Sequence, residues 1–200
     1  MREAVGEKKV NVRSLAVTAV LGAVASALMF VAFNVPVMPS FIQLDLSELP
    51  ALIAAFSLGP VSGVCVCLIK NLVHLLVTTT GGVGELSNFL LGSAFVLPAG
   101  LIYRMRKNRA GAFWGALLGA VAMAVISLPV NYFITYPVYT AFLPLEGIIA
   151  MYQAINPRVE NLLQALIWFN MPFTFVKGML SVGITFLIYK RISPILKGKA

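Results

Sequence analysis

The chain has 200 residues, of which 60% are hydrophobic and 11% are charged, and its mean hydropathy is +0.92. Soluble domains are about 45–50% apolar and about 25% charged, so this composition excludes a soluble protein and predicts an integral membrane protein with a single domain over residues 1–200. The net charge of +8 comes mostly from basic clusters beside apolar segments, a distribution that argues against nucleic acid as a partner.

Apolar runs and helix breakers divide the chain into six predicted helices, the second of them short. The first helix covers residues 13–33. Its apolar run of about 19 residues can cross a bilayer about 30 Å thick, so we interpret it as a retained first helix and do not interpret residues 1–27 as a cleaved signal peptide. The connection 34–48 cannot be helical throughout, because Pro36 and Pro39 interrupt it.

The second predicted helix, residues 49–58, ends at a Gly-Pro pair and is shorter than a membrane span normally requires. The third covers residues 61–78, and a glycine-rich loop follows at 78–84. The remaining elements are helices over 85–104, 111–134 and 162–190, and a mixed connection, partly helical, over 135–161. We therefore predict an all-α membrane protein with six transmembrane helices.

The positions of the charged residues predict how these helices are oriented in the membrane. An even number of helices places both termini on one side, and basic residues gather on the cytoplasmic side. Twelve of the 15 Lys and Arg residues lie before the first apolar run, in the loop at 104–109 or at the C-terminal end. Five of the seven acidic residues fall at or near the opposite face, namely Asp45, Glu48, Glu85, Glu146 and Glu160. We expect a multi-pass protein of the cell membrane with both termini in the cytoplasm.

No pattern in the sequence indicates an enzyme or a metal site. The only histidine is His74, and the two cysteines, Cys65 and Cys67, lie two apart in a predicted helix, so they point to different sides and read as packing residues. No His, Cys and Asp cluster has metal-ligand spacing. The nucleotide-binding, serine-hydrolase and zinc-protease motifs are absent, so we predict neither catalysis nor a cofactor.

Ionisable side chains inside predicted helices are candidates for function, because a charge at membrane depth costs about 2.5–3.5 kcal/mol on insertion scales. Lys70 and His74 are four residues apart in the third helix and share one face. We favour a structural role for Lys70, paired with Glu48, Asp45 or Glu85, over contact with a ligand. We interpret His74 as a hydrogen-bonding group between helices.

A further polar group lies on the last predicted helix. Asn170, Thr174 and Lys177 follow i, i+4, i+7 spacing and therefore share one face, which indicates a pocket wall or a contact between helices. Asn131 follows Pro129 by two residues, at a helix break that neighbouring polar groups can satisfy or that can shape a cavity. Aromatic residues are plentiful in the predicted outer half, and such walls with a few polar donors suit a planar heteroaromatic ligand.

A stripe of small residues marks the first helix. Ala19, Ala23 and Ala27 are spaced four apart, a pattern that lets a second helix approach closely within a membrane. The stripe fits docking onto a partner subunit or packing within this chain, and the spacing alone leaves both interpretations open.

Several segments together resemble the riboflavin-binding S components of energy-coupling factor (ECF) transporters. These segments are LDLSELPALIAAFSLGPVSGV, LIKNLVHLL, GELSNFLLG and MPFTFVKG, and the resemblance extends over nearly the whole chain. It implies six transmembrane helices with a short second one, and an outward-facing vitamin pocket capped by the loop after the first helix. It also implies assembly with a transmembrane coupling subunit and two ATPase subunits.

The resemblance also implies roles for individual residues. Asn131 on the fifth helix and Lys177 on the sixth match residues that address the polar edge of the flavin. Family members often carry an asparagine where this chain has Thr174, whose hydroxyl can still donate and accept a hydrogen bond. The stripe Ala19, Ala23 and Ala27 matches the contact with the coupling subunit.

From these observations we expect an S component that binds riboflavin with high affinity. We expect that it is not an enzyme and that its partner subunits hydrolyse ATP. Riboflavin would be its substrate and not a cofactor. The expected riboflavin contacts are Asn131, Lys177, Thr174, Asn88, Gln43, Leu44 and Asp45, and the expected structural polar residues are Lys70, His74 and Glu85. The alternative is an S component for a different vitamin or a flavin-like heteroaromatic. Two alternatives from other classes are less favoured. A membrane enzyme acting on lipid headgroups would need a carboxylate or histidine cluster near the cytoplasmic face, and the sequence shows none there. A scaffold without a ligand would not carry costly polar residues on three helices.

Overall fold

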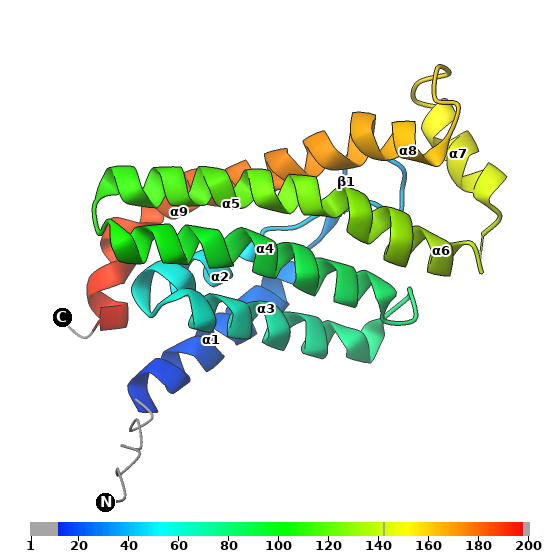
Figure 1. Cartoon of the computed structure of the whole chain (residues 1–200). Helices are drawn as coiled ribbons and strands as arrows, with labels where there is room; N and C mark the ends of the chain where they lie inside the picture. The colour runs from blue at the N-terminus through cyan, green and yellow to red at the C-terminus, as the bar shows by residue number, and fades with distance from the viewer. Residues whose placement is uncertain (1–11, 142, 198–200) are drawn as a thin grey trace, which may run out of the picture.

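The computed structural model describes residues 12–141 and 143–197, with side chains as far as residue 189, as a bundle of helices arranged along one common direction (Figure 1). The long helices are α1 (Val12–Phe30), α3 (Pro60–His74), α4 (Val83–Met105), α5 (Arg109–Val130) and α9 (Met171–Lys197). The only strands among the described residues are β1 (Phe33–Asn34) and β2 (Gln43–Leu44), a two-residue antiparallel pair in the connection between α1 and α2. The predicted all-α membrane fold is confirmed.

Five helical segments are long and apolar enough to cross a membrane. They are Val12–Phe30, Pro60–Val77, Val83–Met105, Arg109–Tyr139 and Leu162–Tyr189. The predicted short helix appears as α2 (Glu48–Ser57), a shorter apolar helix. A count of six transmembrane segments therefore depends on counting α2, and it stays a prediction.

The short helix α2 lies at the centre of the bundle. It contacts α1, α3, α4 and α9, and each of its residues from Glu48 to Phe56 is buried. Small residues allow this close packing: a Cβ atom on Gly63 of α3 would lie 2.9 Å from the carbonyl oxygen of Ala51. The helix ends at Ser57, the chain then turns at Gly59, which has a φ of 117° that favours glycine, and Pro60 begins α3. Because α2 is enclosed by protein, polar groups at its N-terminus can be held by neighbouring helices.

Two of the predicted helices contain a π-helical turn, and the one in the fifth helix lies at the break that Pro129 predicted. In the fifth predicted helix, α5 passes into the π segment η2 (Asn131–Thr135) and then α6 (Tyr136–Tyr139). In the sixth, α8 (Leu162–Ala165) and the π segment η3 (Leu166–Asn170) precede α9. A proline lies within two residues of each π segment, and proline removes an N–H group from the helical ladder, so both irregularities have a local cause.

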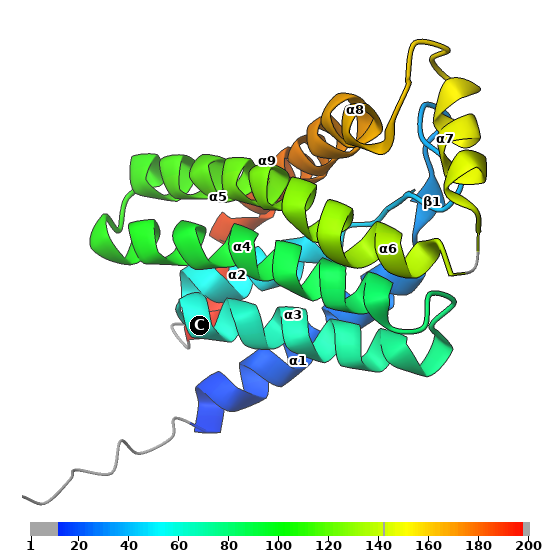
Figure 2. The same ribbon diagram turned by 45° about the vertical axis from the view of Figure 1, so that its right-hand side comes forward.

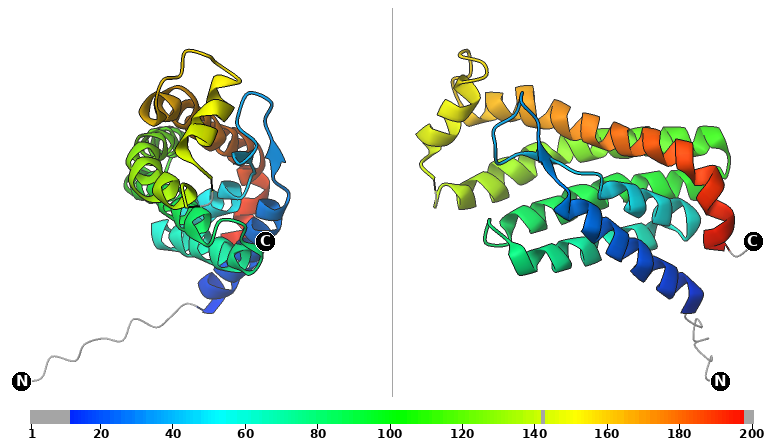
Figure 3. Two further views of the ribbon diagram at one scale, coloured as in Figure 1. Left: turned by 90° about the vertical axis from the view of Figure 1, so that its right-hand side faces the viewer. Right: turned by 180° about the vertical axis from the view of Figure 1, so that it is seen from behind.

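The two ends of the bundle differ in character (Figures 1 and 3). The start of α1, the connection between α4 and α5 and the end of α9 lie at one end, so Arg13 and the basic residues at 104–109 lie at this end. The α3–α4 loop, with η1 (Leu75–Val77), the strand pair and α7 (Leu145–Gln153) lie at the other end, as Figure 2 also shows. The basic residues Arg2, Lys8, Lys9 and Lys199 lie outside the described residues. The cytoplasmic position of both termini stays a prediction.

Candidate ligand-binding site

A cavity of about 170 Å³ lies in the half of the bundle that contains the two π segments. One side is formed by Phe41, Ile42 and Gln43 from the connection between α1 and α2, residues 31–47, which we call the lid loop. The helix α4 contributes Gly84, Ser87, Asn88 and Leu91. The remaining wall comes from Met123 and the η2–α6 residues Asn131, Thr135, Tyr136 and Tyr139, and from Asn170, Phe173, Thr174 and Lys177 on η3 and α9.

The wall combines aromatic rings with a small number of amide and ammonium groups. Phe41, Tyr136, Tyr139 and Phe173 supply ring surfaces, and polar donors and acceptors stand between them. Small-molecule sites in proteins are typically about 300–1,000 Å³ and mostly apolar with a few placed polar groups. The cavity has the matching chemistry, and its volume lies below this range.

Most of the ligand contacts predicted from the sequence lie along this cavity. Gln43, Asn88, Asn131, Thr174 and Lys177 all line it, although they come from four separate parts of the chain. Direct contact of each with a ligand stays a prediction.

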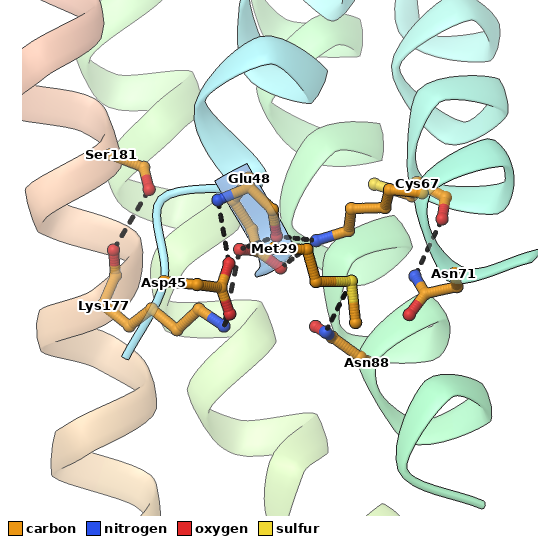
Figure 4. A network of polar contacts seen from close by, with 10 residues as sticks. Met29, Asp45, Glu48, Cys67, Asn71, Asn88, Lys177 and Ser181 are labelled. Carbon is orange, nitrogen blue, oxygen red and sulfur yellow. Dashed lines mark hydrogen bonds and ion pairs between the residues drawn. The ribbon is translucent and has the colours of Figure 1, made fainter. Parts of the chain in front are cut away.

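Leu44 and Asp45, which were also predicted to contact the ligand, do not line the cavity. Leu44 lies instead in an apolar groove beside Trp168 and Val176, on another side of α9. Asp45 is buried and turns toward the ammonium group of Lys177 (Figure 4). The structure thus places Asp45 behind the wall, in contact with a lining residue.

A cluster of four buried charges lies at the junction of the lid loop, α2, α3 and α9. Lys177 Nζ is 2.8 Å from Asp45 Oδ2 and 3.5 Å from Glu48 Oε2. On the other side of Glu48, Lys70 Nζ lies 2.7 Å from Oε1. Two carboxylates and two ammonium groups therefore alternate, and we call Asp45, Glu48, Lys70 and Lys177 the four-charge cluster.

The four-charge cluster holds the end of the lid loop in place. Asp45 Oδ1 accepts a hydrogen bond from the backbone N–H of Ser47 at 2.8 Å, and Lys70 donates to Ser47 Oγ at 2.6 Å. Burial acts to raise the pKa of Asp45, but the ammonium groups of Lys177 and Lys70 outweigh it and hold the pKa well below its usual value. Of the three acids that the sequence offered to Lys70, its direct partner is Glu48.

Glu85 is held by a separate set of contacts at the α3–α4 loop. His74 Nδ1 lies 2.8 Å from Glu85 Oε1, and the imidazole ring stacks on Phe30 with 5.4 Å between ring centroids. The hydroxyls of Thr78 and Thr80 donate to Glu85 Oε2 at 2.9 and 3.2 Å. These contacts link α1, the α3–α4 loop and α4 beside the cavity.

A ring of hydrogen bonds joins the cavity to α7. The hydroxyl of Tyr152 donates to Asn170 Oδ1 at 2.6 Å, and Asn170 Nδ2 donates to the hydroxyl of Tyr136 at 3.1 Å. The hydroxyls of Tyr136 and Tyr152 also contact each other, which closes the ring. Tyr152 is fully buried, so this ring fixes the side chains of two lining residues, Tyr136 and Asn170.

Comparisons with known proteins agree with this arrangement. A family model described as the substrate-specific component of ECF transporters matches residues 13–189. The chain belongs to this family of S components. It is 31% identical over 195 residues to the riboflavin transporter RibU of Staphylococcus aureus (strain TCH60), covering 96% of this chain and 98% of that protein. It is 29% identical over 189 residues to the riboflavin transporter FmnP of Bacillus subtilis (strain 168), covering 92% and 94%.

A solved structure of the S component of a bacterial ECF transporter has the same fold. It superimposes with a TM-score of 0.73 at 30% sequence identity, covering 92% of this chain and 98% of that one. The family consists of transporter components and not of enzymes, in agreement with the absence of catalytic motifs from the sequence. No group of three or more His, Cys, Asp or Glu side chains in the described part of this S component could hold a metal ion.

The small-residue stripe lies on the outside of this S component. Ala19, Ala23 and Ala27 are exposed on α1, whereas Gly22 lies on the adjacent buried face toward α3, where an added Cβ atom would lie 2.8 Å from Ile69 Cγ2. The helix α1 thus packs on α3 through Gly22, and the exposed stripe does not take part in this contact. Of the two interpretations that the spacing left open, the structure does not support packing within the chain.

Several residues of the site could not be assigned from the sequence of this S component. Ser87, Thr135 and Met123 line the cavity without any distinguishing local pattern. The sequence did not distinguish Tyr136 and Tyr152 from the other aromatic residues of the predicted outer half. Their hydroxyls come together only in the folded chain. The position of Asn170 on one face with Thr174 and Lys177 was the one available signal for its place in the wall.

Proposed function

We propose that this S component binds riboflavin with high affinity in the cavity between the lid loop, α4, η2–α6 and α9, and delivers it across the cell membrane. The relatives named as riboflavin transporters match more than nine-tenths of the chain, which supports riboflavin as the substrate. The observation that carries the proposal is the meeting of Asn131 and Lys177 at one wall of a cavity with aromatic sides.

The chemistry of the wall suits a flavin. The isoalloxazine ring system is planar and aromatic, so it can stack against rings such as Tyr139 and Phe173. Its pyrimidine edge carries carbonyl oxygens and ring nitrogens, which the amide of Asn131, the hydroxyl of Thr174 and the ammonium of Lys177 can address. Gln43 of the lid loop and Asn88 of α4 would complete the polar contacts.

Delivery requires a defined orientation and partners. We place the cavity and the lid loop on the outer side, and the end with the basic clusters in the cytoplasm. This arrangement counts α2 as a membrane segment, which brings the total to six. In this arrangement the exposed stripe Ala19, Ala23 and Ala27 faces a transmembrane coupling subunit. Two ATPase subunits bound to that coupling subunit would hydrolyse ATP, because this chain carries no nucleotide-binding motif.

The absorption spectrum of the purified protein tests the proposed substrate. After expression in cells grown with riboflavin, the protein should carry a flavin spectrum, and the protein freed of ligand should quench the fluorescence of added riboflavin at a stoichiometry of one. A preparation that carries a different vitamin and leaves riboflavin fluorescence unchanged would show that it is an S component for another ligand.

A further inference from the structure

The ammonium group of Lys177 has fixed neighbours on the side away from the cavity. It lies 2.8 Å from Asp45 and 3.5 Å from Glu48, and neither carboxylate lines the cavity (Figure 4). An ammonium group has three N–H donors. With two of them directed at carboxylates, the third remains for a ligand at the wall.

Glu48 in turn is held from its other side. Its Oε1 accepts a hydrogen bond from Lys70 at 2.7 Å, and its Oε2 accepts one from Ser47 at 3.3 Å. Glu48 and Lys70 are both fully buried. The position of the carboxylate beside Lys177 therefore depends on Lys70, which lies on a different helix.

A lysine side chain needs such support to act as an oriented donor. Its four-carbon stem is flexible and its ammonium is a compact point charge, so the position of the charge is set by its partners. Ordering a flexible side chain on binding costs affinity, and a group that is already ordered avoids this cost. The four-charge cluster is also balanced, with two positive and two negative groups, which suits a ligand edge without net charge.

We propose that Glu48 and Lys70 are positioning residues of the binding site. They hold the ammonium of Lys177 in the orientation that addresses the ligand, although neither touches the cavity. This inference rests on the proposed function, because it takes riboflavin as the ligand that Lys177 contacts. It assigns to Lys70 a role in affinity that acts through Lys177, in addition to its role in stability.

A double-mutant cycle tests this role. The variant Glu48→Gln/Lys70→Met removes one charge of each sign, so the remaining pair of Asp45 and Lys177 stays balanced. We expect it to weaken riboflavin binding about tenfold, the effect of one well-placed hydrogen bond to a charged group. In a Lys177→Met background the same two substitutions should change the affinity by less than about twofold, because the group on which they act is gone.

A second variant keeps the test informative without altering any charge. Ser47→Ala removes the hydroxyl that links Lys70 to Glu48, and we expect a smaller loss of affinity that also disappears in the Lys177→Met background. The matched control is Ser127→Ala on α5. Ser127 is as fully buried as Ser47 and its hydroxyl donates to the carbonyl of Ala124 at 2.6 Å, but it lies outside the four-charge cluster. It should leave the affinity unchanged.

The outcomes separate this inference from the proposed function. If the wild-type protein does not bind riboflavin, the proposed function is wrong. If the wild type binds riboflavin and both Glu48→Gln/Lys70→Met and Ser47→Ala bind it with wild-type affinity, the positioning role is overturned. It is also overturned if their losses are the same with and without Lys177, because this additivity is the result of a general structural effect.

Discussion

Lys177 of α9 and Asp45 of the lid loop form a buried ion pair across 132 positions of the sequence, with 2.8 Å between Nζ and Oδ2. Lys177 lines the cavity, and Asp45 belongs to the segment that closes one side of it. The pair therefore fixes the lid loop to the helix that carries the main cationic group of the wall. This relationship links the conformation of the lid to the presentation of Lys177.

The first prediction concerns Lys177 and Asn131 as ligand contacts. Loss of a hydrogen bond to a charged donor removes about 1.5–3 kcal/mol, and loss of a neutral one about 0.5–1.5 kcal/mol. Lys177→Met should therefore weaken riboflavin binding by about one to two decades, and Asn131→Leu by less, as measured by quenching of flavin fluorescence. Wild-type affinity in both variants would place the ligand elsewhere.

The second prediction concerns the stability that Lys70 provides. Both Lys70 and Glu48 are fully buried, and removing one partner of a buried ion pair typically costs about 3–5 kcal/mol. Lys70→Met should lower the thermal unfolding midpoint of the detergent-solubilised protein and its folded yield. Adding Glu48→Gln should restore most of the loss, because no unpaired carboxylate then remains. A midpoint in Lys70→Met equal to that of the wild type contradicts this assignment.

The third prediction concerns the hydroxyl of Tyr152. Tyr152→Phe keeps the ring but removes the donor to Asn170 and opens the ring of hydrogen bonds. We expect a loss of about 0.5–1.5 kcal/mol in unfolding free energy and a weaker affinity for riboflavin, since Asn170 and Tyr136 both line the cavity. Tyr132→Phe is the matched control, because Tyr132 is 41% exposed. Equal affinities in the two variants would restrict Tyr152 to a role in stability.

The sequence allowed much of the wall to be predicted because its signal is local. Asn170, Thr174 and Lys177 share a face by helical spacing alone, and all three line the cavity. The buried short helix α2 could be predicted from an apolar run that ends at Gly59 and Pro60. In both cases the residues that form the pattern lie within about ten positions of each other.

The features that could not be predicted depend on contacts between distant segments. The sequence offered three acids to Lys70, and only the packing of α2 against α3 selects Glu48. The sequence predicted the segment that contains Tyr152 as a mixed connection. No local pattern therefore indicated that Tyr152 contacts Asn170. The π segments follow from prolines whose effect on a helix depends on how neighbouring groups satisfy the freed backbone.

The fourth prediction concerns orientation in the membrane. A cysteine at position 107, in a protein in which Cys65 and Cys67 are replaced by alanine, should resist a membrane-impermeant thiol reagent in intact cells and react after the cells are opened. The loop around position 107 is exposed in the structure and rich in arginine and lysine, which favours the cytoplasmic side. Glu146→Cys at the other end of the bundle is the control and should react from outside. Efficient external labelling at position 107 would reverse the proposed topology.

The last prediction concerns the stripe on α1. Replacing Ala19, Ala23 and Ala27 by leucine should weaken co-purification with the coupling subunit and reduce riboflavin uptake, because close approach of two helices in a membrane needs small side chains. Riboflavin affinity of the isolated S component should persist, since the stripe is exposed and lies away from the cavity. The control is Val121→Leu/Val125→Leu on α5, where two residues four apart are 41% and 49% exposed. If assembly and uptake survive in the alanine variant as they do in this control, the stripe faces lipid.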